Sequence, residues 1–230
     1  MRVAVLADIH GNLPALEAVL RGIDAAGVDA IVLNGDLSTG PMPAETVERL
    51  AELGDRAIWV RGNADRELVA AYDGALNPDL PEAGRLPTEH GASRLARRHR
   101  DLLADLPLSV ALDVTGLGQV RFCHATTRSD TEIMLVDSPL ERYRAAFADT
   151  AEPTVVLGHT HMPFDRLADR RRFVKPGQRR GAVRRHRRLL CVARTGCGSA
   201  RGGRHTLREG NRNRGEEDRP GRDRGGEGLR

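Results

Sequence analysis

Short apolar runs alternate with longer amphipathic segments through the first part of this chain. The runs RVAVLA, DAIVLN, AIWV, QVRF and TVVL are rich in Val, Leu and Ile, which is typical of buried β-strands. After the first run, apolar residues recur at helical spacing at Leu13, Leu16, Leu20 and Ile23, with Asn12 as an N-cap. Strands that alternate with helices predict an α/β fold.

The same pattern predicts the remaining elements. We expect helices over about residues 44–53, shortly after Asp65, over about 90–104 in an Arg-rich segment, and from Pro139 to about Ala148. SVALDV and QVRFCH flank the turn residues TGLG, which predicts a β-hairpin. Residues 73–88 contain three prolines and two glycines and are expected to form a loop or lid.

Residues that bind divalent metals follow each of the five apolar runs. They are two aspartates, an asparagine and four histidines: Asp8 and His10 in ADIHGN, Asp36 in NGDLSTG, Asn63 in RGNAD, His124 in FCHAT, and His159 and His161 in GHTH. Strand ends can bring these side chains to one edge of a sheet, and the set suffices for two ions. Asp36 is the candidate for a shared ligand, because each carboxylate oxygen can hold one metal. Oxygen and imidazole ligands without thiolate suit Mn, Fe, Zn, Ni or Co.

Each motif has a structural interpretation when it is taken alone. Asp, Gly or Asn after a strand usually forms a turn, and a single histidine such as His124 is more often hydrogen-bonded in a core. The two histidines of GHTH flank a threonine, a pattern with little structural purpose. Five motifs in series favour a two-metal centre, and two metals about 3.5–4 Å apart can clamp the attacking and leaving oxygens of a phosphoryl displacement. The set therefore indicates a hydrolase.

Composition excludes several other classes of protein. The chain has 230 residues and three cysteines without a CxxC pair, so neither a disulfide framework nor a zinc ribbon is expected. We expect a soluble protein of the reducing cytoplasm, because the sequence shows no signal-peptide pattern and no apolar run of about 20 residues.

Charge divides the chain into two unlike parts. Residues 1–165 carry 25 acidic and 15 basic side chains, whereas residues 166–230 carry 7 acidic and 21 basic ones. From about Gln178 the periodicity disappears, and Arg and Gly dominate. A basic tail of this kind is typically disordered and can bind nucleic acid through the phosphates. This one lacks the aromatic residues that would stack on bases.

The order DxH, GD, GN, a lone His and GHxH resembles the calcineurin-like metallophosphoesterases, and within them the small bacterial and archaeal phosphodiesterase-like group. The resemblance covers about residues 1–177. It implies an α/β fold of four layers, an αββα sandwich, with two divalent ions at the strand ends, manganese being favoured. It also implies that a metal-bridging hydroxide is the nucleophile. One ion would be held by Asp8, His10, Asp36 and His161, and the other by Asp36, Asn63, His124 and His159.

One departure from the family's pattern concerns the leaving group. Many members carry GNH followed by an acid, and that histidine is thought to protonate the leaving group. This chain reads GNAD, so Ala64 replaces the histidine and Asp65 is expected to have nothing to orient. We therefore expect a preference for good leaving groups such as aryl phosphoesters, or another acid, for which His90 and His99 are candidates.

Two further side chains are candidates for contact with a substrate. Asn63 belongs to the ligand set, and Arg128 lies four residues after His124, where its guanidinium could bind a phosphate oxygen bidentately. The alternative for Arg128 is a loop salt bridge with Asp130 or Glu132.

A second departure lies at the carboxyl end. Related chains continue after GHTH with Asn-Pro-Gly-Ser-Val-Gly and closing strands, whereas this chain reads RRFVKPG and then QRRGAVRRHRR. Codons for residues from Gln178 can be chosen so that a one-base shift restores Ser-Val-Gly-Ala-Pro-Tyr-Gly. We therefore expect a metallophosphoesterase domain over residues 1–177 with incomplete closing strands. Residues 178–230 would form a disordered or aberrant tail, with a frameshift as one explanation.

The sequence thus predicts a dinuclear metal-dependent phosphoesterase that acts on small-molecule phosphodiesters or phosphomonoesters. One alternative is a non-catalytic interaction module on the same fold. Another is a nucleic-acid-directed phosphodiesterase that uses the basic tail. The pattern leaves the natural substrate and the oligomeric state open.

Overall fold

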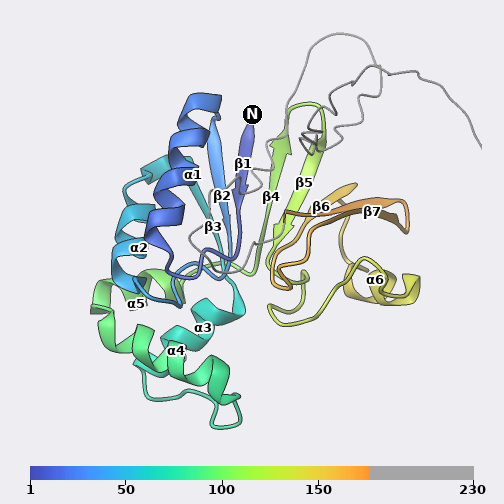
Figure 1. The fold of residues 1–230 in the computed structure, drawn as a ribbon. Helices are drawn as coiled ribbons and strands as arrows, with labels where there is room; N and C mark the ends of the chain where they lie inside the picture. Colours follow the sequence, from blue (N-terminus) through green and yellow to red (C-terminus); the bar gives the residue numbers. More distant parts are fainter. Residues whose placement is uncertain (177–230) are drawn as a thin grey trace, which may run out of the picture. The chain divides into compact units, whose positions relative to one another are not determined.

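A parallel sheet of three strands opens the fold in the computed structural model, which describes residues 1–176. Its strands are β1 (Val3–Leu6), β2 (Ala30–Asn34) and β3 (Ala57–Val60), in that order. Helix α1 (Leu13–Ala26) links β1 to β2, and α2 (Pro43–Ala51) with the 3-10 turn Gly54–Arg56 links β2 to β3 (Figure 1). Asn12 caps α1 by accepting a hydrogen bond from the Ala15 N–H, as the sequence predicts.

A second, mixed sheet has five strands in the order β4-β5-β6-β8-β7. They are β4 (Ser109–Val114), β5 (Gly118–Cys123), β6 (Thr154–Val156), β7 (Phe164–Ala168) and β8 (Arg171–Lys175). β4 and β5 form the predicted hairpin, and β7 and β8 form another, while β6 runs parallel to both β5 and β8. Helix α6 (Leu140–Ala146) lies between β5 and β6 in the chain.

Three further helices follow β3, and here two expectations are wrong. They are α3 (Asn63–Tyr72), α4 (Glu82–Arg94) and α5 (Arg97–Ala104). The loop expected over residues 73–88 is therefore partly helical, with Pro87 inside α4, and the single helix expected over 90–104 is two helices. α4 packs closely on α3, since a Cβ at Gly91 would lie only 2.7 Å from Leu68, and this packing outweighs the weak local propensity.

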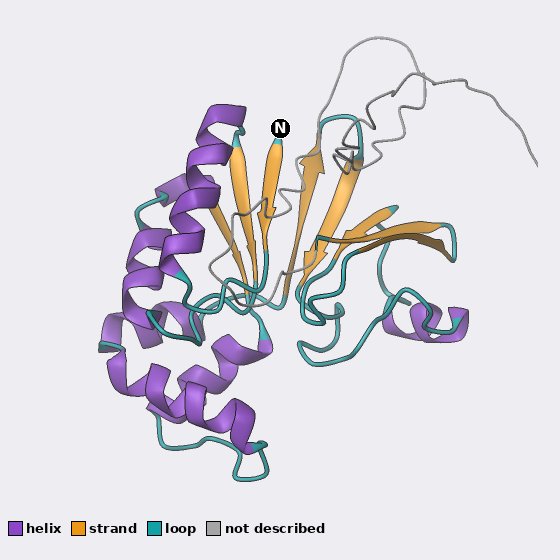
Figure 2. Ribbon diagram, viewed as in Figure 1, coloured by secondary structure: helices purple, strands orange, loops and turns teal. Residues whose placement is uncertain are grey.

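Alternation along the strands divides the core into layers (Figure 2). One face of the first sheet packs against the second sheet, through Val3, Val5, Val32, Val60, Val114, Val120, Phe122 and Val156. The other face packs against α1 and α2, through Ala4, Leu6, Ile31, Leu33, Leu16, Leu20, Ile23, Val47 and Leu50. Helix α6 covers the outer face of the second sheet, where Tyr143 and Phe147 contact Phe173. The four-layer αββα arrangement is confirmed.

Within residues 1–176, no helix is both long enough and apolar enough to cross a membrane. The expected incompleteness of the closing strands, the Arg/Gly-rich tail and the frameshift hypothesis all concern segments outside the described residues.

Candidate metal centre

The structure gathers the predicted ligands into two groups that share one carboxylate. Ligand atoms lie within 4.8 Å of one another in the group Asp8, His10, Asp36 and His161, and likewise in the group Asp36, His124 and His159. These residues directly follow β1, β2, β5 and β6, and Asn63 follows β3. Asp36 belongs to both groups, which is the position that a bridging ligand needs.

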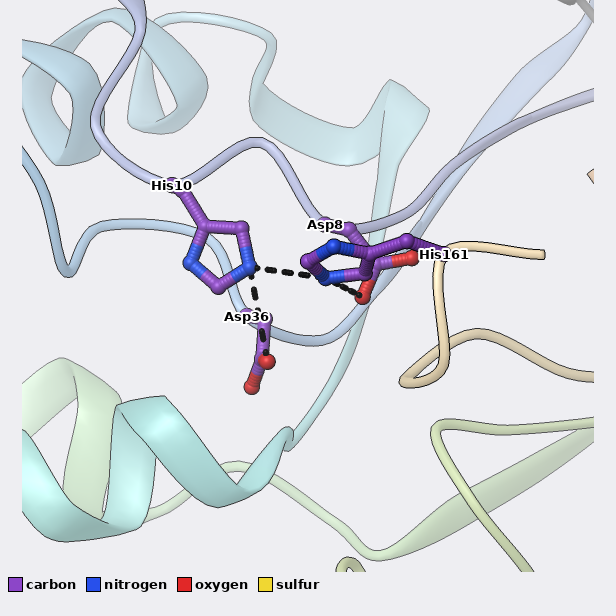
Figure 3. Close-up of side chains that lie close together, drawn as sticks. All are labelled: Asp8, His10, Asp36 and His161. Carbon is purple, nitrogen blue, oxygen red and sulfur yellow. Dashed lines mark hydrogen bonds and ion pairs between the residues drawn. The ribbon is translucent and has the colours of Figure 1, made fainter. Parts of the chain in front are cut away.

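The first group contains two carboxylates and two imidazoles (Figure 3). Nε2 of His10 lies 3.2 Å from Nε2 of His161 and 3.7 Å from Oδ2 of Asp36. Nε2 of His161 lies 3.4 Å from Oδ1 of Asp8. Four ligating atoms from loops far apart in the sequence thus converge on one small volume.

The second group is deeper. The side chain of His124 is fully buried, and its Nε2 lies 3.3 Å from Oδ1 of Asp36. Its Nδ1 lies 2.9 Å from the Asn34 carbonyl, which can only accept, so Nδ1 carries the proton. His159 stacks edge-on to His124 with ring centroids 5.3 Å apart, and its Nε2 lies 3.2 Å from the Thr131 carbonyl.

The charges of the two groups depend on each other. Burial would raise the pKa of Asp36, but the charges of His124 and His10 hold it well below its usual range. Burial would lower the pKa of His124, but the carboxylate of Asp36 raises it to about 9. For His159, burial and the charge of His124 lower the pKa. Asp36 therefore stays ionised and attracts cations to the point where the groups meet.

The expectation that Asp65 has nothing to orient is wrong. Its buried carboxylate accepts three backbone hydrogen bonds of 2.9 Å, from the N–H groups of Asp36, Leu37 and Gly62. Burial and the charge of Asp36 raise the pKa of Asp65 to about 7. Asp65 joins the loop after β2 to the start of α3 and so fixes the backbone of the shared ligand.

Five of the seven predicted ligands have left-handed backbone conformations. The φ angles are 56° for Asp8, 50° for His10, 55° for Asp36, 73° for His159 and 58° for His161. Non-glycine residues adopt this region rarely, at a cost of about 1–3 kcal/mol each, and such residues cluster at functional sites. The strain is an independent reason to regard this edge of the sheets as the functional site.

Asn63 supplies a direct indication that a ligand fits here. Its Oδ1 atom is buried without a hydrogen-bond partner among the described residues, whereas its Nδ2 lies 3.5 Å from Oε1 of Glu67. A buried acceptor without a donor is costly unless something else binds it. A divalent cation is suited to this oxygen, and the carboxylates and imidazoles nearby are ligands of the same kind.

Arg128 is engaged in the structure. Its Nε and Nη2 bind the carboxylate of Glu132 at 2.9 and 2.7 Å, and its Nη1 donates to the Ala145 carbonyl. The predicted salt bridge is thus with Glu132 rather than with Asp130, which binds Arg61 and Arg66 instead. The role of Arg128 in substrate binding stays a prediction.

The two candidate proton donors lie in the helical layer. His90 is exposed on α4. His99 is buried: its Nδ1 accepts from the Ala96 N–H, and its Nε2 lies 3.1 Å from Oε1 of Glu48. Both nitrogens of His99 thus hold α5 in place, against its own N-terminus and against α2.

The residues that support the ligands are not among those predicted from the sequence. Asn34, Thr131 and Lys175 act through contacts with residues far away along the chain. Asn34 is buried, accepts from His124 through its carbonyl, and donates from Nδ2 to the Cys123 carbonyl at 3.0 Å. A polar residue at the end of an otherwise apolar strand was the one local indication of its role.

Comparisons with known proteins agree with this geometry. Phosphodiesterase YfcE of Escherichia coli K12 is 40% identical over 77 residues, which is 30% of this chain and 42% of YfcE, so the match spans less than half of that relative. The structure of a metallophosphoesterase from Sphaerobacter thermophilus has a TM-score of 0.59 at 27% identity, covering 77% of this chain and 76% of that one. Hypothetical protein PH1004 from Pyrococcus horikoshii OT3 shares the fold, with a TM-score of 0.66 at 22% identity and 76% coverage of both chains.

The family itself follows from a longer match. Residues 1–196 match the calcineurin-like phosphoesterase superfamily domain, a segment that includes all seven predicted ligands. The match runs past residue 177, so the position of the domain's end stays a prediction. The resemblance drawn from the five motifs is confirmed, and the chain belongs to the calcineurin-like phosphoesterase superfamily.

Proposed function

We propose that this chain is a metal-dependent phosphoesterase that hydrolyses small-molecule phosphodiesters or phosphomonoesters at a two-metal centre. The observation that carries the proposal is the pair of ligand groups that meet at Asp36. Membership of the calcineurin-like phosphoesterase superfamily supports phosphoester chemistry, and the name of YfcE supports a diester.

The seven residues would divide between two ions. One ion would be held by Asp8, His10, Asp36 and His161, and the other by Asp36, Asn63, His124 and His159. We propose manganese, with Fe, Zn, Ni and Co as alternatives that the same ligands accept. Bound there, the ions would activate a water molecule and neutralise charge on the phosphoryl oxygens.

The chain's own groups prepare the ligands for this task. The Asn34 carbonyl holds a proton on Nδ1 of His124, so Nε2 is the nitrogen that faces Asp36 and would bind an ion. The Ala64 N–H donates to Oδ1 of Asp36 at 2.9 Å, and Oδ1 of Asp8 accepts from the His159 N–H at 3.0 Å. These hydrogen bonds orient both carboxylates.

Neither Ala64 nor His99 is available to protonate the leaving group. Position 64 holds alanine, which has no proton to give, and both nitrogens of His99 are occupied in the helical layer. General acid catalysis typically contributes about 10²–10⁴-fold. We therefore propose that aryl esters, whose leaving groups need little protonation, are hydrolysed much faster than alkyl esters.

The proposal is tested by hydrolysis of bis-p-nitrophenyl phosphate and p-nitrophenyl phosphate. Metal-stripped protein is assayed with and without added Mn²⁺, beside Asp36→Asn and the matched control Asp113→Asn, an exposed carboxylate on β4. We expect Mn²⁺-dependent turnover that Asp36→Asn lowers by more than about 100-fold, the upper end of losses for outer-shell partners. The control should keep wild-type activity.

Other outcomes identify the alternatives. A folded protein without turnover under any of the five metals would refute the proposal and favour the interaction module. Steep salt dependence of binding to DNA, abolished by removal of residues 178–230, would favour the nucleic-acid-directed enzyme. Equal rates for aryl and alkyl esters would contradict the absence of a leaving-group acid.

A further inference from the structure

A buried lysine lies behind the metal centre, and neither the fold nor the proposed reaction accounts for it. Lys175 is the last residue of β8 and the only lysine of the chain. It is 2% exposed, and its Nζ lies 5.2 Å from the centre of the Phe164 ring. Lysine is almost never fully buried unless its ammonium is paired, so the contacts of this group need an explanation.

The ammonium of Lys175 bonds to two different loops of the site. It donates to Oγ1 of Thr160 at 2.8 Å and to the Met134 carbonyl at 2.9 Å. Thr160 stands between the ligands His159 and His161. Met134 lies three residues after Thr131, whose carbonyl contacts Nε2 of His159. One side chain therefore joins the segment 159–161 to the segment 131–134.

The segment 159–161 needs such support. His159 and His161 both have left-handed φ angles, 73° and 58°, and Thr160 is the residue between them. Strained conformations of this kind persist only where the surrounding structure determines them. The Thr160 N–H bonds to the Gly158 carbonyl within the same turn, so the lysine contact is what attaches the threonine side chain to the second sheet.

We propose that Lys175 is a positioning residue that holds His159 and His161 in the conformation that binds metal, by fixing Thr160 and the 131–134 loop. The inference rests on the proposed two-metal function. It assigns to Lys175 the role of an outer-shell partner, which orients ligands without touching the ion.

The charge of Lys175 and its positioning role predict opposite changes in metal affinity when the lysine is removed. Burial opposes the ammonium and lowers its pKa to about 8. A positive charge near a cation site weakens metal binding, so removal of the lysine would tighten binding if charge were the main effect. If positioning is the main effect, removal weakens binding.

The experiment is Mn²⁺ titration calorimetry on the full-length metal-stripped chain. It compares the wild type with Lys175→Met, Thr160→Val and the double variant. We expect each single variant to weaken Mn²⁺ binding by about 10–100-fold, as is usual for outer-shell partners. The double variant should lose little more than Lys175→Met alone, because Lys175→Met already removes the bond to Thr160. Unchanged or tighter binding in Lys175→Met, or additive losses, would overturn the proposal.

A second readout needs no metal and no turnover. Because Lys175 is the only lysine, ¹⁵N-lysine labelling gives a single side-chain Nζ resonance. We expect protons that exchange slowly with water, and faster exchange in Thr160→Val, which keeps the side chain's shape. Fast exchange in the wild type would overturn the proposal even if Lys175→Met failed to fold. Absence of Mn²⁺ binding by the wild type would refute the proposed function as well, whereas wild-type affinity in both variants would refute this inference alone.

Discussion

Gly62 tests whether the backbone sets the position of the shared ligand. This residue precedes Asn63, and a Cβ added to it would lie 2.2 Å from both the backbone N and Oδ1 of Asp36, and 3.0 Å from its Cγ. The φ and ψ angles of Gly62, −97° and 170°, are extended and suit alanine. The nearest obstacle to Gly62→Ala is therefore Asp36.

The size of the effect follows from that contact. Nonbonded heavy atoms settle at about 3.5–4.0 Å, so Asp36 or α3 must move by roughly 1 Å or more. Overpacking of this kind costs about 1–3 kcal/mol of stability. A misplacement of 1 Å in a catalytic site can cost about 10²-fold in rate. We expect Gly62→Ala to fold with lower stability and to lose Mn²⁺ affinity and phosphodiesterase activity together.

The matched control is Gly22→Ala, a glycine in the interior of α1. A Cβ there would meet nothing within 4 Å, and alanine should stabilise the helix by about 0.5–1 kcal/mol. Thermal unfolding and Mn²⁺ titration of both variants give the comparison. Two-ion binding with wild-type affinity in a folded Gly62→Ala protein would refute the reasoning, because Asp36 would then tolerate displacement.

Three further predictions follow from single contacts. Asp65→Ala should lower the free energy of unfolding by about 3 kcal/mol. Three buried N–H groups lose their acceptor, at about 1–3 kcal/mol each, and removal of a buried carboxylate offsets part of that loss. A loss below about 1 kcal/mol in urea unfolding would contradict this. If Arg128 binds substrate, Glu132→Gln should free it and lower KM, and Arg128→Ala should raise KM; no change in either variant would exclude the role. Burial lowers the pKa of Lys175 from 10.5 to about 8, so the unfolded chain binds more protons than the folded one between these pH values. The stability of the wild type relative to Lys175→Met should therefore rise by about 3 kcal/mol from pH 8 to 10.5. A stability difference that does not change with pH would show that the pKa is not lowered.

The strands and the ligand set could be predicted because their signals are local. A short Val-rich run reads as a strand by itself, and parallel strands deliver the residues that follow them to one edge. Asp8, Asp36 and His124 each follow such a run, so the sequence alone was enough to expect them together. The two ligand groups in the structure agree with that expectation.

The errors arose where a residue acts through distant partners. Asp65 follows a motif that lacks its usual histidine, and local reasoning left it without a role. In the structure its carboxylate accepts hydrogen bonds from the N–H groups of Asp36 and Leu37, which are 29 and 28 residues away in the chain. Pro87 and Gly84 similarly argued against a helix within residues 73–88, but the close packing of α4 on α3 at Gly91 outweighs that local preference. Such contacts carry no periodic or motif signal.

The left-handed backbone conformations of the ligand residues also arise from contacts between segments that are distant in the sequence. The loops after β1 and β2 continue to pair beyond the strands: the N–H groups of Asp8, His10 and Gly11 donate to the carbonyls of Gly35, Asp36 and Leu37, each at 3.0 Å. This pairing places Asp8 and His10 opposite Asp36 at a fixed register, and the strained φ angles are what the chain adopts to keep it. The carboxylate of Asp65 then fixes the loop after β2 by accepting hydrogen bonds from the N–H groups of Asp36 and Leu37, which the pairing does not use. The first sheet, extended past its last regular residue, therefore determines how Asp8 and His10 lie relative to Asp36, and the side chains supply the chemistry.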